Sequence, residues 1–387
     1  MAANLWLQNG KIPSPDCIIY FIRSERWKLK ISTEPTASRL FPIDLLKALS
    51  ITAVVSFHSI FILPSEYVSH TRLLDILFAP LRFCVPVLLT ISFFLLKRNL
   101  EHNQEPIYQI VKKRLIRLLI PTVFWFTIAI VIKKFLWYTN KAQLLIFVLQ
   151  GTIFPGSYYL LILFQLFPIL IFLHPWFNQR RNLLITFILQ SIAFILIYTA
   201  LAGSFGNVFP WVLGNIHRPL FIYWFIYMAM GSYFSKNWSA LVKLSQRIPI
   251  SFKILLLISI SLIMIAESSS LQSLNGESIT PYEYAMFSCI MSVVALFICF
   301  ASIEENKISL PLQKAVKLLS TYSLGIFCIN GIVNITFVAI LAPILKQANF
   351  NLLQILGMKL IGWIFLLALS IWISKRIDKL GFPALVR

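Results

Sequence analysis

Three ionisable side chains fall within the first long apolar segment of the chain, residues 43–63: Asp44, Lys47 and His58. A charge at the centre of a bilayer costs on the order of 2.5–3.5 kcal/mol, so each of them needs a physical reason. Lys47 and His58 are eleven residues apart, which in a helix is about 20° more than three full turns and about 16 Å along the axis. Asp44 falls on the same stripe, one turn before Lys47. The spacing predicts one helix face with a charge pair at its start and an imidazole farther in.

His58 is the histidine best placed for chemistry, because the others fall in loops or near the ends of apolar segments. Imidazole suits general acid–base work at neutral pH, and burial favours the neutral form that accepts a proton. A structural histidine that bonds across helices is the alternative, and the position by itself does not separate the two. Lys47 also has a simpler explanation, as a lysine near a helix end that reaches the headgroups and pairs with Asp44.

A second cluster, residues 112–117, contains four cationic side chains directly before another apolar segment. Arg114 and Arg117 are one helical turn apart, and with Lys113 they could grip the phosphates of a ligand. Such clusters also serve simply as anchors on the anionic inner surface of a membrane. The sequence leaves both interpretations open.

The composition determines what kind of scaffold must position these residues. With 387 residues, 58% hydrophobic residues, 12% charged residues and a mean hydropathy of +0.81, an ordinary globular protein is excluded. The net charge of +20 does not indicate nucleic acid, because the basic residues form short clusters between apolar runs. The five cysteines show no paired spacing, and no cluster of His, Cys and Asp has the spacing of a metal site. We therefore expect a membrane protein without a metal.

A bilayer core needs about 20 apolar residues in helix, and the chain contains about ten such runs. We therefore predict an all-α membrane protein with about ten transmembrane helices. The expected spans are residues 43–63, 76–96, 118–135, 158–173, 183–201, 220–234, 252–266, 284–303, 318–342 and 352–374. The apolar run 144–155 is a candidate re-entrant or interfacial piece.

The distribution of basic residues predicts the orientation. With the N-terminus in the cytoplasm, the cytoplasmic segments contain 25 of the 34 Lys and Arg residues, and the opposite side contains 6. Both termini are then cytoplasmic. The predicted organisation is a cytoplasmic tail of residues 1–38, a membrane domain of residues 39–376 and a short basic tail of residues 377–387.

Several segments carry a recognisable pattern. Lys47 precedes His58 by eleven positions, and Pro86 lies in a Val-Pro-Val segment before Phe93 and Phe94. Arg114-x-x-Arg117 precedes Pro121. Residues 157–160 fall at the start of the fourth predicted helix, and residues 320–330 fall in a late one. Together these segments resemble the acyltransferase 3 family of integral membrane acyltransferases, over residues 39–376. Phe93 stands where that family usually has glycine, and Asn330 where it usually has histidine.

The resemblance implies transfer of an acyl group, acetyl by default, from cytoplasmic acyl-CoA to a hydroxyl of a cell-envelope sugar, glycan or lipid-linked sugar in the cell membrane. Acyl-CoA would be a co-substrate, with no bound cofactor, no nucleic-acid partner and membrane lipids as surroundings. His58 would be catalytic, with Lys47 and Asp44 beside it in the motif, and Arg114, Arg117 and Lys113 would bind the donor. Further candidates for substrate contact are Tyr158, Tyr159, Arg82 and Asn330.

Two questions stay open at this level. His58 could act as a general base or form an acyl-histidine intermediate, since both need the same imidazole in the same place. The leading rival function is a transporter or flippase for a glycan or lipid, which an equal number of helices would suit. A catalytically silent relative that acts as a scaffold is a third reading, because Phe93 and Asn330 depart from the family pattern.

Overall fold

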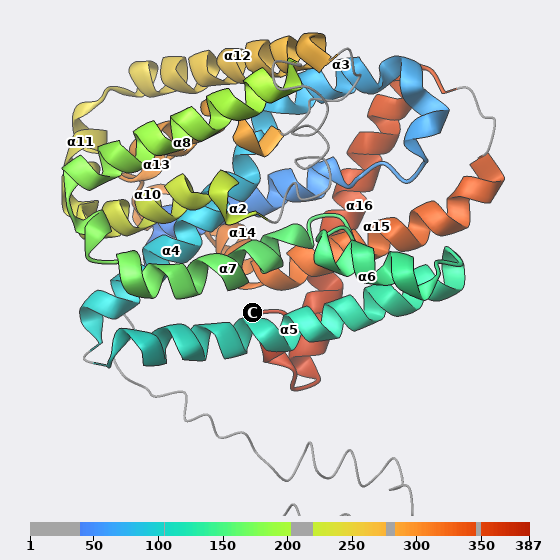
Figure 1. The fold of residues 1–387 in the computed structure, drawn as a ribbon, viewed down its shortest axis with the longest axis horizontal. Coiled ribbons are helices and arrows are strands. Elements are labelled where there is room, and N and C mark those ends of the chain that lie inside the picture. Colours follow the sequence, from blue (N-terminus) through green and yellow to red (C-terminus); the bar gives the residue numbers. More distant parts are fainter. Residues whose placement is uncertain (1–38, 104, 203–219, 276–282, 346–349) are drawn as a thin grey trace, which may run out of the picture. The chain divides into compact units, whose positions relative to one another are not determined.

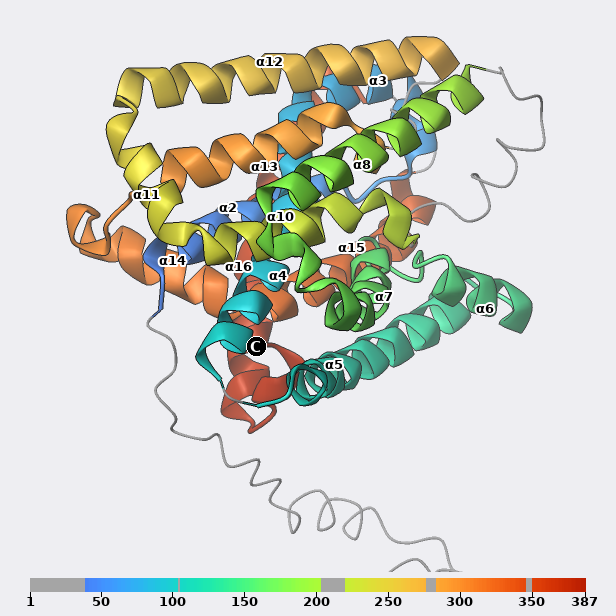
Figure 2. The same cartoon turned by 60° about the vertical axis from the view of Figure 1, so that its left-hand side comes forward.

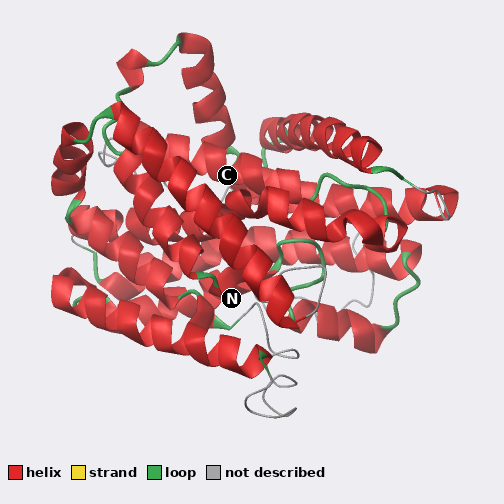
Figure 3. Ribbon diagram, turned by 90° about the horizontal axis from the view of Figure 1, so that it is seen from above, coloured by secondary structure: helices red, strands yellow, loops and turns green. Residues whose placement is uncertain are grey.

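The computed structural model describes residues 39–103, 105–202, 220–275, 283–345 and 350–387. Within these ranges the chain is helical and contains no strand (Figure 3). The predicted N-terminal tail, residues 1–38, lies outside the described residues. The main helices are α2 (Phe41–Phe57), α3 (Val68–Phe78), α4 (Cys84–His102), α5 (Ile107–Leu136), α6 (Lys141–Leu149), α7 (Tyr158–Leu173), α8 (Arg180–Leu201), α10 (Phe225–Lys236), α11 (Trp238–Arg247), α12 (Ile250–Asn275), α13 (Phe287–Phe300), α14 (Leu310–Thr321), α15 (Ser323–Leu345) and α16 (Leu352–Lys379).

Six helical stretches among the described residues are long and apolar enough to cross a bilayer. They are the stretch Ser65–His102 and the helices α5, α8, α12, α15 and α16. In the first of these, the short helix η1 (Pro64–Tyr67) precedes α3, and η2 (Ala79–Phe83) joins α3 to α4. The prediction of an all-α, multi-pass membrane protein is therefore confirmed.

The predicted number of about ten spans is not confirmed. Each predicted apolar run contains helix, but residues 43–63, 158–173, 220–234 and 284–303 correspond to the shorter helices α2, α7, α10 and α13. The first run was predicted as one helix through residue 63, whereas α2 ends at Phe57 and residues 58–63 are not helical. At 1.5 Å per residue, α2 is about 25 Å long and α10 about 18 Å long, less than the thickness of about 30 Å of a bilayer core. The cytoplasmic location of both termini stays a prediction.

Helix α2 is enclosed by other helices. It packs against α4, α13, α14, α15 and α16, and Leu46, Ile51 and Val55 on it are fully buried. A helix that is apolar on nearly all sides belongs inside a bundle. In contrast, α12 and α5 lie at two outer edges of the helix packing, and α16 crosses the direction of most other helices (Figures 1 and 2).

Helices α4 and α10 are packed unusually closely. A Cβ atom added to Gly231 would lie 2.3 Å from the carbonyl oxygen of Thr90 and 2.9 Å from Cβ of Phe93. Phe93 itself is fully buried and meets Phe167 of α7 edge to face, with ring centroids 5.4 Å apart. Phe93, which stands where the resemblance described above usually has glycine, therefore fills part of the core.

The apolar run 144–155 forms α6 followed by a buried turn. Ile153 and Phe154 in this turn are fully buried. Gly151 has φ of 62°, and a Cβ there would lie 2.5 Å from Cα of Tyr158. Only glycine fits this left-handed, tightly packed position without strain. The turn leads directly into α7 and so sets where Tyr158 begins that helix.

The last residues of the chain pack against the helices. Helix α16 continues to Lys379, beyond the start of the predicted C-terminal tail at residue 377. Trp125 Nε1 donates a hydrogen bond of 3.0 Å to the carbonyl of Leu385, and the amide of Gly325 donates one of 3.1 Å to the carbonyl of Val386. Val386 is fully buried. Residues 383–387 thus contribute to the core formed with α5 and α15.

Replacing Gly231 by alanine is expected to destabilise the protein by about 1–3 kcal/mol, because the new methyl group forces α10 away from α4. Thermal unfolding of the purified chain in detergent measures this as a lower Tm. Gly357→Ala in α16 is the matched control, because a Cβ there meets nothing within 4 Å. An unchanged Tm in Gly231→Ala would contradict the close packing.

Candidate functional site

A cavity of about 320 Å³ lies next to the C-terminal end of α2. His58 lines it, together with three other polar side chains, those of Asp75, Arg82 and Glu283. Much of the remaining wall is aromatic and comes from five different parts of the chain: Phe57, Tyr158, Trp224, Tyr284 and Phe327. An apolar cavity of this size with a few convergent polar groups is typical of a ligand site.

His58 lies where α2 ends. Its backbone has φ of −102° and ψ of 11°, and its amide donates to the carbonyl of Val55 in the last helical turn. Asn334 Nδ2 donates to the carbonyl of His58 at 2.7 Å and to that of Ile60 at 3.2 Å. These bonds satisfy backbone oxygens that a helix end would otherwise leave without a donor. The turn that carries His58 is therefore fixed by α15.

Helix α16 holds the same end of α2 from another direction. The buried ammonium group of Lys359 donates to the carbonyl of Ser56 at 2.5 Å, where a cation complements the negative end of the helix dipole. A Cβ on Gly362 would lie 2.0 Å from the carbonyl oxygen of Ser59, so the backbone of this turn rests directly on α16. Lys359 falls within the predicted span 352–374, and no sequence pattern indicated a role for it.

Asn330 orients the imidazole of His58. The amide Nδ2 of Asn330 donates to the carbonyls of Ile326 and Phe327, at 2.6 and 2.7 Å. Because both donors point into their own helix, Oδ1 is the atom that contacts Nδ1 of His58. Oδ1 can only accept, so Nδ1 carries a proton, and in the neutral imidazole the lone pair is on Nε2.

Asp44 and Lys47 lie near the N-terminal end of α2, whereas the cavity lies at its C-terminal end. Asp44 is buried and accepts a hydrogen bond of 2.5 Å from Ser320 Oγ of α14. Lys47 is half-buried. Neither is among the described residues that line the cavity. The predicted stripe therefore reaches the cavity at His58 alone.

The predicted donor-binding cations are placed differently from one another. Lys113 and Arg117 are exposed on α5, and Lys113 forms an ion pair of 2.5 Å with Glu105. Arg114 is half-buried and interacts electrostatically with Tyr159 of α7. None of these three residues is among the described residues that line the cavity. Of this cluster, Arg114 is the residue turned toward the helix interior.

Tyr159 packs between α4 and the cavity wall. Its hydroxyl and that of Ser92 lie 3.0 Å apart, and its ring packs on Phe327 with centroids 5.1 Å apart. The preceding residue, Tyr158, lines the cavity and stacks on Trp224 at 5.9 Å. The two neighbouring tyrosines thus face different groups, Tyr158 the cavity and Tyr159 the α4 and α5 side.

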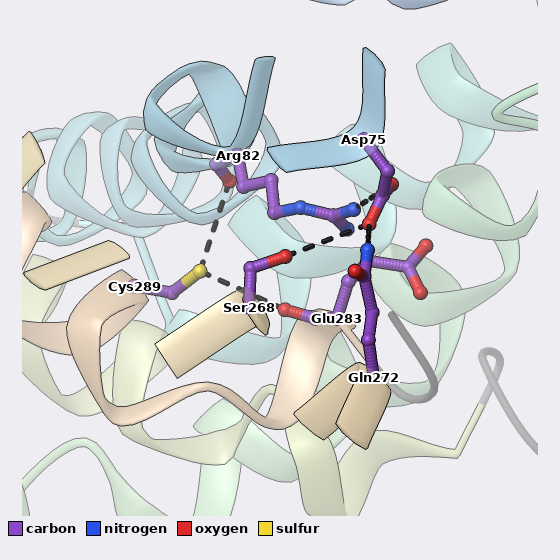
Figure 4. A network of polar contacts seen from close by, with 6 residues as sticks. All are labelled: Asp75, Arg82, Ser268, Gln272, Glu283 and Cys289. Carbon is purple, nitrogen blue, oxygen red and sulfur yellow. Dashed lines mark hydrogen bonds and ion pairs between the residues drawn. The ribbon is translucent and has the colours of Figure 1, made fainter. Parts of the chain in front are cut away.

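Arg82 belongs to a buried ionic network in the cavity wall (Figure 4). Its guanidinium group pairs with Asp75, and Asp75 also accepts from Gln272 Nε2 at 2.6 Å and Ser268 Oγ at 3.5 Å. Sequence reasoning identified Arg82 but missed Asp75 and Glu283. Asp75 precedes Arg82 by two helical turns, a spacing that could have indicated the pair. No sequence pattern indicated Glu283.

A family model described as "Acyltransferase domain" matches residues 42–374, which is most of the chain and includes all of the candidate site residues. No curated protein and no solved structure matches the chain.

Asn334→Ala is expected to loosen the His58 turn, because it leaves two backbone carbonyls without their donor at a cost of about 1–3 kcal/mol. Hydrogen–deuterium exchange of residues 58–63 should become faster. Thr336→Ala on the same helix is the control, since its hydroxyl bonds only locally to the carbonyl of Ile332. Equal exchange in the two variants would contradict the proposed restraint.

Proposed function

The chain belongs to the family of acyltransferase domains, and from this membership we propose that it is an integral membrane O-acyltransferase of the cell membrane. It takes an acyl group, acetyl by default, from cytoplasmic acyl-CoA and transfers it to a hydroxyl of a cell-envelope sugar or glycan. The observation that carries this proposal is the cavity-lining imidazole of His58, whose Nδ1 meets the Oδ1 acceptor of Asn330. No cofactor is needed beyond the acyl-CoA co-substrate.

His58 acts as the general base. Nε2 takes the proton from the acceptor hydroxyl as the oxygen attacks the thioester carbonyl carbon. When the carbon–sulfur bond breaks, the proton is returned to the leaving thiolate, so the products are the ester and free CoA. A positioned base contributes about 10²- to 10⁴-fold to such a step. A route through acyl-histidine uses the same lone pair on Nε2 and stays an alternative.

The donor enters beside α5. Arg114, Arg117 and Lys113 lie on the side predicted to be cytoplasmic and bind the phosphates of acyl-CoA. The packing of α5 against α7 supports an entry on this side, because the ring of Tyr159 of α7 packs on Phe327, which lines the cavity. The acyl end then reaches His58 while the nucleotide stays at the surface.

The two departures from the family pattern are compatible with catalysis. Phe93 packs on Phe167 in the core and is not among the described residues that line the cavity. Asn330 supplies an acceptor to Nδ1 of His58, a role that fixes the tautomer of a catalytic imidazole. These placements support an active enzyme over a silent scaffold. Nothing in the described helices specifically favours a transporter.

His58→Ala is expected to lower acyl transfer by at least 10²-fold, because the base is removed. Asn330→Ala should lower it about tenfold or more by releasing the tautomer and the ring. Purified protein in lipid vesicles with radiolabelled acetyl-CoA and a membrane glycan extract measures both. His102→Ala is the control, since that side chain is exposed at the end of α4. Unchanged turnover in His58→Ala would refute the assignment.

Arg114→Ala is expected to raise KM for acetyl-CoA by about tenfold or more, because a charge-assisted bond worth about 1.5–3 kcal/mol is lost. Arg117→Ala should have a similar effect, and Lys113→Ala a smaller one because Lys113 is already paired with Glu105. Lys112→Ala, an exposed neighbour, is the control. Equal KM values in all four variants would show that the donor binds elsewhere.

A further inference from the structure

The elbow between α5 and α6 carries three lysines that the proposed acyl transfer does not use. They are Lys133 and Lys134 in the last turn of α5 and Lys141 at the first position of α6. The chain has no acidic residue between Glu105 and Glu267. Among the described residues, none of the three lysines forms an ion pair. Their positive charge is therefore not balanced by the described part of the protein.

The preference of cytoplasmic segments for basic residues does not account for these lysines. In the orientation that the basic residues predict, the elbow lies on the non-cytoplasmic side, where Lys and Arg are rare. Three of the 6 basic residues counted on that side fall in the short stretch from Lys133 to Lys141. The elbow thus concentrates positive charge where the topology does not require it.

The backbone of the elbow is fixed. The amides of Trp137 and Thr139 each donate to the carbonyl of Lys133 at 3.2 Å. Between them, Tyr138 has φ of 52°, a left-handed conformation that is unfavourable for a residue other than glycine, so the surrounding bonds must stabilise it. Trp137 Nε1 also donates to the carbonyl of Ile335 in α15 at 3.1 Å. The lysines therefore flank a turn that is attached to the helix bundle.

Helix α6 lies beside the end of α5 and positions Lys133 (Figures 1 and 2). Lys133 Nζ lies 3.8 Å from the centre of the Phe147 ring and donates to the carbonyl oxygen of Thr152 at 3.4 Å. Neither contact supplies a negative charge. An ammonium group has three N–H donors, and the Thr152 carbonyl accepts from one of them. Lys133 therefore keeps donors for a further acceptor, and Lys134 beside it is exposed.

Large apolar side chains at the elbow and on α6 are exposed. Phe135 is 65% exposed, Tyr138 89%, Leu145 60% and Leu149 67%. Helix α5 is long and apolar enough to cross a bilayer, whereas α6, about 14 Å long, is too short. Aromatic residues and lysines at the end of a membrane helix are typical of the level of the lipid headgroups. A soluble anion would leave these apolar side chains in water, whereas the acyl chains of a lipid cover them.

We propose that the elbow binds the phosphate group of an anionic phospholipid through Lys133, Lys134 and Lys141. The ammonium groups donate charge-assisted hydrogen bonds to the phosphate oxygens, and the acyl chains lie along the exposed apolar residues of α5 and α6. The bound lipid lies beside the turn whose Pro155 and Gly156 line the cavity, because Lys133 contacts Thr152 in the same turn. This inference is independent of the proposed acyl transfer.

Photocrosslinking of the full chain in phosphatidylcholine nanodiscs tests the site. The probes are phosphatidylglycerol and phosphatidylcholine with the same diazirine-bearing acyl chain, and mass spectrometry locates the crosslinked peptides. Within residues 133–149, the phosphatidylglycerol probe should crosslink at least about fivefold more than the phosphatidylcholine probe, because its net negative charge is attracted by the lysines. Lys133→Gln/Lys134→Gln should abolish most of this preference. The matched control, Arg180→Gln/Arg181→Gln, removes the same charge from an exposed pair at the start of α8 and should keep the preference.

Equal crosslinking of the two probes at the elbow would overturn the inference. An equal loss of preference in both glutamine variants would do so too, because lipid binding would then follow total charge alone. Competition by soluble glycerol 1-phosphate would assign the site to a soluble anion, and stronger competition by polyprenyl phosphate than by unlabelled phosphatidylglycerol would assign it to a lipid carrier. Either result overturns the phospholipid assignment. Lys133→Arg/Lys134→Arg, which keeps both charges, should keep the preference, and thermal unfolding identifies variants that fail to fold.

Discussion

The site depends on one constraint: the backbone carbonyl groups where α2 ends must receive hydrogen bonds from other side chains. Inside a membrane, no water is available for a broken helix, so each freed oxygen needs a donor from the protein. Lys359 supplies one to Ser56, and Asn334 supplies those for His58 and Ile60. Because α15 and α16 provide these donors, α2 can stop at Phe57 and present an imidazole in a turn.

The same helices explain why the imidazole is held in one state. Asn330 directs its own Nδ2 into α15 and leaves Oδ1 for His58. One turn farther along α15, Asn334 holds the backbone of the same residue. Two asparagines on one face of α15 thus fix the ring and the main chain together. The proposed role of His58 as a general base requires rigid support of this kind.

The proposed mechanism needs two sets of residues, and only one of them lines the cavity. The aromatic wall and the Asp75–Arg82 pair line the cavity with His58. Arg114 lies on α5 and is not among the described residues that line it. Family membership accounts for the proposed reaction class, and the cavity accounts for its proposed location.

The sequence by itself determined the helices and the leading residue of the site. Long apolar runs indicate where a membrane chain must be helical, and each predicted run contains helix, although the first run was predicted to stay helical beyond Phe57. The spacing from Lys47 to His58 singled out His58 because helical periodicity is local. Only the tertiary structure decided how many runs are long enough to cross, and which residues surround His58. Asn334, Lys359 and Glu283 lie more than 200 positions away, and packing between helices, which no local period encodes, brings them to the end of α2.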